Sequence, residues 1–61
     1  MTKQMYVSVI NNMPPTYEVK EARAFLNGVY LLAIEDFDVL SDDMLEITLI
    51  GEQVMKRIRG G

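Results

Sequence analysis

The chain has 61 residues, of which nine are acidic and six basic, so its formal net charge is −3, and it contains no cysteine, histidine or tryptophan. This composition excludes disulfides and thiolate chemistry, and it leaves neither the usual zinc ligands nor an imidazole general base. Because so short a chain buries only ~60% of the surface that it exposes when unfolded, we expect one small domain, residues 1–61, that forms a homo-oligomer or binds a partner tightly.

The first predicted element is a half-buried β-strand over residues 4–10. Core-side and outward positions alternate through this segment, and β-branched and aromatic residues are frequent in it, as is typical of strands. The two sets are Met5, Val7 and Val9 on the core side and Gln4, Tyr6 and Ser8 on the outer side. Pro14 and Pro15 follow closely and limit the strand, because proline offers no backbone donor to a sheet.

The second predicted element is an amphipathic helix that begins at about Thr16, a residue suited to the N-cap position. Apolar side chains then recur at spacings of three and four residues, which is the period of one helix face, at Val19, Ala22, Leu26, Val29 and Ala33. One interpretation continues this helix to Ile34. The other ends it at Asn27 and Gly28, a pair typical of helix C-termini, and makes residues 29–34 a buried strand.

The third predicted element is a helix that starts at Ser41, because serine caps helix N-termini and acidic residues favour the first turn. Apolar residues again share one face, and bases followed by glycine suit the C-terminal end; the apolar set is Met44, Ile47, Ile50, Val54, Met55 and Ile58. The alternative is a strand over residues 44–50, a turn at Gly51 and a short C-terminal helix. Both interpretations give the α+β fold class.

The candidate functional region is acidic and spans residues 35–46. It contains six carboxylates and no base, and the residues expected to bind a partner are Glu35, Asp36, Phe37, Asp38, Asp42 and Asp43. Such a surface attracts a basic partner, for example a nucleic-acid-binding protein. Phe37 either folds back over the core or anchors the interface. Small acidic chains of this kind are similar in size and charge to phage-type inhibitors of host proteins.

Other function classes find little support in the sequence. No nucleophile–base arrangement and no glycine-rich phosphate loop is present, so we expect no catalytic residue, no enzymatic activity and no cofactor. The acidic region lacks the glycine and distal glutamate of an EF-hand, so we expect no metal site. The longest apolar run has six residues, whereas a membrane-spanning helix needs ~20. We therefore expect a cytoplasmic protein without a membrane partner.

A strand followed by two helices resembles the ribbon-helix-helix family of dimeric repressors. The resemblance implies that the strand pairs with its twin and places Gln4, Tyr6 and Ser8 in the major groove of DNA. Proline near the start of the first helix and the cap at Ser41 also fit. The first helix and the linker are several residues longer than in that family, however, and the outward strand positions carry no base. Direct binding of nucleic acid is therefore not expected.

The C-terminal residues Arg57, Ile58, Arg59, Gly60 and Gly61 resemble the tail of ubiquitin-like proteins and of the sulfur carriers. In those families the terminal carboxylate is adenylated, and the slim glycines enter an activating enzyme. The resemblance implies a carrier that acts through Arg59, Gly60 and Gly61. It covers five residues of 61, and prolines 14 and 15 leave no room for the second strand of a β-grasp hairpin.

Overall fold

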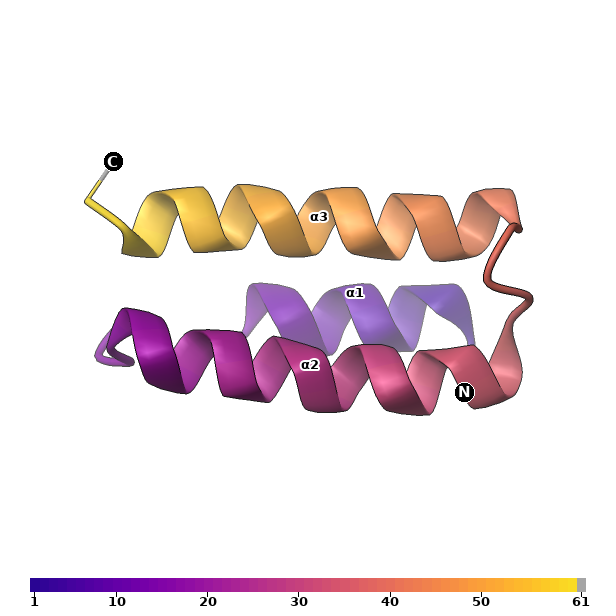
Figure 1. Ribbon diagram of the computed structural model, residues 1–61, viewed down its shortest axis with the longest axis horizontal. Helices are drawn as coiled ribbons and strands as arrows, with labels where there is room; N and C mark the ends of the chain where they lie inside the picture. The colour runs from indigo at the N-terminus through magenta and orange to yellow at the C-terminus, as the bar shows by residue number, and fades with distance from the viewer. Residues whose placement is uncertain (61) are drawn as a thin grey trace.

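The computed structural model describes residues 1–60, which form three α-helices: α1 (Lys3–Asn11), α2 (Val19–Asp36) and α3 (Asp42–Ile58). Figure 1 shows α2 and α3 side by side and antiparallel, with α1 behind the pair. Residues 1–60 contain no strand. The predicted α+β class is therefore wrong, and the described part of the chain is a three-helix bundle.

The predicted N-terminal strand is helix α1. The side chain of Thr2 caps it by accepting a hydrogen bond from the Met5 N–H at 3.3 Å. The buried residues are Tyr6, Ile10 and Met13, at spacings of four and three, whereas Met5 and Val9 are exposed. The 3.6-residue period prevails over the alternation: Tyr6 and Ile10 are buried while Ser8 between them is exposed, whereas a strand would place all three on one face.

Helix α2 confirms the predicted apolar face but not the predicted start. Four of the five predicted residues are buried, namely Ala22, Leu26, Val29 and Ala33, whereas Val19 is 36% exposed. The N-cap is Glu18 rather than Thr16. The helix continues through Asn27 and Gly28 to Asp36, so the alternative strand at residues 29–34 is wrong. An exposed glycine costs a helix about 1 kcal/mol, which is less than the chain would lose by unburying Val29 and Ala33.

Helix α3 is the long helix of the first interpretation, and the alternative strand at residues 44–50 is wrong. Ser41 caps it, because its hydroxyl accepts a hydrogen bond from the Met44 N–H at 3.1 Å. Gly51 lies in the middle of the helix and is buried. It is tolerated there because the ring of Tyr30 from α2 occupies the space where a side chain would be.

The helices meet in a core of apolar side chains, of which Ile10 and Ile47 are fully buried. The full set is Tyr6, Ile10, Met13, Ala22, Leu26, Val29, Ala33, Met44, Ile47 and Val54. Phe37, directly after α2, packs edge-on against Tyr6 with the ring centroids 5.6 Å apart. None of the helices in residues 1–60 combines the length and the apolar character needed to cross a lipid bilayer.

Candidate protein-interaction site

The acidic region predicted from the sequence lies at one end of the bundle. The end of α2, the connector over residues 37–41 and the first turns of α3 meet there, at the right of Figure 1. Six carboxylates belong to this end: Glu35, Asp36, Asp38, Asp42, Asp43 and Glu46. They divide into those that bind other parts of the protein and those that do not.

Asp36 stabilises the contact between α1 and α2. Its Oδ2 atom accepts hydrogen bonds from the Tyr6 hydroxyl at 2.5 Å and from the N-terminal ammonium group of Met1 at 3.1 Å. The hydrogen bond from Tyr6, supported by that from the ammonium group, lowers the pKa of Asp36. The same bond, together with burial, raises the pKa of Tyr6 to about 12. Asp36 is thus a structural residue in addition to its predicted role in binding.

Lys3 binds two more of the carboxylates. Its Nζ atom lies 2.7 Å from Glu46 Oε2 and 3.5 Å from Asp43 Oδ1, so it joins the start of α1 to the first turns of α3. The hydrogen bond and charge of Glu46 raise the pKa of Lys3, and Asp43 adds to the effect. All three side chains remain partly exposed, and such ion pairs contribute little to stability. Asp43 is nevertheless less available to a partner than the sequence suggested.

Replacing Asp36 by asparagine is expected to change how stability depends on pH. Since the pKa of Asp36 is lowered in the folded state, the unfolded chain binds a proton more readily, and the free energy of unfolding falls as the pH drops from ~5 through the folded-state pKa. Asp36→Asn should flatten this decrease. It should also lower the pKa of Tyr6, whose stabilisation is lost as the pH rises from ~10 to ~12.

The measurement is urea denaturation across the pH range. Tyr6→Phe is the companion variant, because it removes the hydroxyl that binds Asp36 and leaves the ring against Phe37. It should flatten the acid decrease in part and reduce the alkaline one, of which a part remains because burial also raises the pKa of Tyr30. If both variants keep the full dependence of the parent at low pH, Asp36 is not the group that carries it.

Phe37 folds back over the core, which is the first of the two positions predicted for it. Its ring packs edge-on against Tyr6 and belongs to the half-buried margin of the core. A side chain that already stabilises the bundle is only partly available as an anchor for another protein. The connector exposes a different apolar residue instead.

That residue is Leu40, whose exposed fraction is 92%. The connector holds it in a defined turn: Asp38 Oδ1 accepts a hydrogen bond from the Leu40 N–H at 3.0 Å, and the Asp38 carbonyl accepts one from the Ser41 hydroxyl at 2.7 Å. Val39 beside it is also exposed. Sequence reasoning missed Leu40, since an apolar residue between an acidic segment and a helix cap is equally consistent with burial.

Three carboxylates lie within five residues of this apolar pair in the sequence and form no ion pair within residues 1–60. They are Glu35 at the end of α2, Asp38 in the connector and Asp42 in the first turn of α3. We call Glu35, Asp38, Val39, Leu40 and Asp42 the acidic tip. Chemically it offers a protruding apolar side chain among unpaired negative charges, and nothing that activates a nucleophile or a water molecule.

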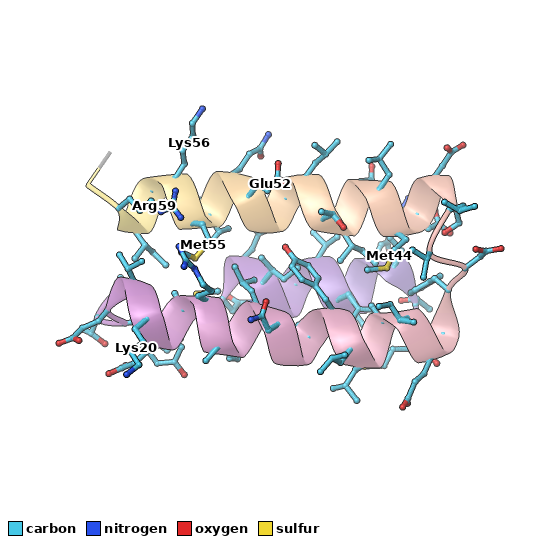
Figure 2. The ribbon with its side chains drawn as sticks, in the orientation of Figure 1. Lys20, Met44, Glu52, Met55, Lys56 and Arg59 are labelled. Atoms are coloured by element: carbon cyan, nitrogen blue, oxygen red, sulfur yellow. The ribbon has the colours of Figure 1, made fainter. Side chains whose placement is uncertain are left out.

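The bases gather at the opposite end of the bundle. Figure 2 shows Lys20 from the start of α2 and Lys56 and Arg59 from the end of α3 at this end. Within residues 1–60 only Lys3, among the lysines and arginines, forms a salt bridge with an acidic side chain. The bundle therefore carries an excess of negative charge at one end of its long axis, which measures 31 Å, and an excess of positive charge at the other end, where Glu18 and Glu21 also lie.

The predicted C-terminal tail is only partly described. Arg59 is the C-cap of α3, and Gly60 adopts a positive φ of 104°, a conformation that glycine favours. Gly61 lies outside the described residues. The fold implied by either family resemblance does not agree with the bundle, because both families need an N-terminal strand and this segment is α1.

No cluster of three or more potential metal ligands occurs in residues 1–60, in spite of the density of carboxylates at the acidic tip. Comparison of the chain with protein-family models, with curated proteins and with solved structures gives no match.

Proposed function

We propose that the chain is a non-enzymatic protein–protein interaction module that docks its acidic tip on a basic partner. The observation that carries the proposal is Leu40, which is 92% exposed and is flanked by three carboxylates without ion-pair partners in residues 1–60. Val39 next to it is 59% exposed, and adjacent exposed apolar side chains with polar residues around them are a feature of binding surfaces.

The two properties of the tip have different roles in binding. The carboxylates of Glu35, Asp38 and Asp42 attract a positive surface over a distance and accelerate association. Leu40 supplies affinity, since burying a leucine side chain contributes ~1.5–3 kcal/mol. Its turn is held by the Asp38 hydrogen bonds before binding, which lowers the ordering cost of association.

The partner that fits this tip has a basic surface with an apolar pocket. Nucleic-acid-binding proteins have basic surfaces of this kind, and an acidic protein that covers one competes with the nucleic acid. A small module of this type therefore acts as an inhibitor or regulator, and it needs neither a cofactor nor a catalytic residue.

The test compares proteins captured by the tagged chain with those captured by two variants, followed by affinity measurement on each purified partner. Leu40→Ser should weaken binding by roughly tenfold or more, as expected for the loss of a buried leucine. Glu35→Gln combined with Asp38→Asn should slow association and reduce its dependence on salt. Asparagine keeps an acceptor for the Leu40 N–H, so the turn is preserved.

The matched control is Glu18→Gln combined with Glu21→Gln, which removes the same charge at the other end of the bundle. This control should bind as the parent chain does. The proposal fails if every captured partner binds the Leu40 and the Glu35/Asp38 variants as tightly as the parent, or if the control weakens binding equally.

A further inference from the structure

A groove of about 530 Å³ runs between α2 and α3 on the side away from α1. Tyr30, Leu26 and Met55 supply its apolar lining, and Arg23, Lys56 and Arg59 lie along it at the basic end of the bundle. Figure 2 looks onto this face, with Met55 between the two helices and Arg59 beside it. The groove lies in the half of the α2–α3 face that contains the start of α2 and the end of α3.

The other half of the same face protrudes instead of being hollow. Ile34 of α2 and Leu45 of α3 are 45% and 57% exposed there. Both continue the helix faces that line the groove, because Ile34 follows Tyr30 by four residues and Leu45 precedes Leu49 by four. Apolar side chains thus project from one half of this surface, and an apolar hollow lies in the other half.

The charged residues of α3 are also divided between these two halves of the face. Residues at spacings of three and four share its outer stripe, and in chain order they are Asp42, Leu45, Leu49, Glu52, Lys56 and Arg59. The stripe begins acidic, is apolar in the first half and ends basic. The matching stripe of α2 is antiparallel to that of α3, and it goes from Lys20 and Arg23 at the basic end of the bundle to Ile34 near the acidic end.

We propose that two copies of this chain associate through the α2–α3 face in an antiparallel, two-fold arrangement. Turning one copy end over end places Leu45 and Ile34 of each copy against the groove of the other. The same rotation sets Asp42 of each copy near Lys56 and Arg59 of the other. Each copy contributes α2, with 18 residues, and α3, with 17 residues. These four helices of similar length pack against one another as in a four-helix bundle.

A parallel arrangement of two copies does not have these properties. It would set protruding side chains against protruding ones and the basic end of one copy against the basic end of the other, which is unfavourable. The antiparallel dimer also gives this small chain a larger shared core. It does not involve Leu40, Glu35 or Asp38, but it shares Asp42 with the acidic tip, so in the dimer a basic partner is attracted by Glu35 and Asp38.

The test uses sedimentation equilibrium on the purified full chain and on two single variants. The parent should form a dimer of twice 7.0 kDa. Leu45→Lys places a positive charge where Lys56 of the second copy lies, and Lys56→Glu places a negative charge near Asp42 of the second copy. Each variant alone should therefore associate at least about tenfold more weakly than the parent, which makes its dimer less stable by ~1.4 kcal/mol.

An equimolar mixture of the two variants should restore the dimer. In the mixed dimer, the lysine introduced at position 45 of one variant faces the glutamate introduced at position 56 of the other. At the second, symmetry-related contact both positions keep the residues of the parent. Circular dichroism of each variant establishes that its helices are intact. Arg57→Glu is the matched control, because it reverses a charge one residue away on the side of α3 near Met13 and Pro15, and it should dimerise as the parent does.

Two results would overturn the proposal. One is a parent chain that stays monomeric at concentrations on the order of 1 mM, where even a weak specific interface is occupied. The other is a pair of folded variants that are impaired separately and do not associate when mixed, or a Lys56→Glu variant that associates more strongly than the parent, as a parallel dimer requires.

Discussion

Replacing Ile47 by alanine should unfold a large fraction of the protein at room temperature. Ile47 is fully buried in the middle of α3, and truncating such a side chain costs about 2–5 kcal/mol, because the transfer free energy is lost and a cavity remains. A single core in a domain of this size rarely supplies more than ~3–5 kcal/mol. The substitution therefore removes most of the available stability.

Urea denaturation followed by circular dichroism measures this loss. The control is Leu31→Ala, which truncates a leucine on α2 that is 69% exposed, and which should change the free energy of unfolding by no more than ~0.5 kcal/mol. If the two variants were equally stable, Ile47 would not belong to the core. Working at low protein concentration keeps self-association from masking the difference.

The sequence predicted α2 and α3 well for a local reason. Ala22, Leu26, Val29 and Ala33 repeat with the period of a helix, and the cap at Ser41 is formed by a hydroxyl and an N–H only three residues apart. Signals of this kind lie within a few residues of one another and do not depend on the rest of the chain. Glycine and asparagine in the middle of α2 left its end open, because burial of the following turn decides whether the helix continues.

Helix α1 was missed because its nine residues fit two periods at once. The alternation of Met5, Val7 and Val9 favours a strand, whereas the spacings of four and three from Tyr6 to Ile10 and Met13 favour a helix. Contacts far along the chain decide between them: the Tyr6 hydroxyl binds Asp36 and the Leu32 carbonyl, and its ring meets Phe37. No local pattern reports contacts made 26 to 31 residues away.

The same dependence explains how much of the acidic site could be predicted. The carboxylates are close in the sequence, so their presence at one end of the bundle follows from the short connector alone. Which of them are engaged does not follow, because Lys3 and Tyr6 reach them only from α1 in its helical form. Leu40 was overlooked for a similar reason, since its exposure is a property of the packed bundle.

Gly51→Ala should destabilise the protein, although alanine is the better helix former. A Cβ atom at this position would overlap the Tyr30 hydroxyl and lie 2.9 Å from Tyr30 Cζ. The rigid ring moves only as a whole, so Tyr30 must leave its place against α3, where its hydroxyl donates to the Thr48 carbonyl at 3.4 Å. Overpacking of this kind costs about 1–3 kcal/mol, which exceeds the gain in helix propensity of up to about 1 kcal/mol.

Gly28→Ala provides the matched comparison, because it is the same substitution in a helix interior with no atom within 4 Å of the new methyl group. It should stabilise the protein by about 0.5–1 kcal/mol. The difference between the two variants in urea denaturation measures the cost of displacing Tyr30. In a Tyr30→Ala background that cost is absent, so Gly51→Ala should become stabilising as well. A destabilising effect that persists there would mean that the ring of Tyr30 is not the reason for glycine at position 51.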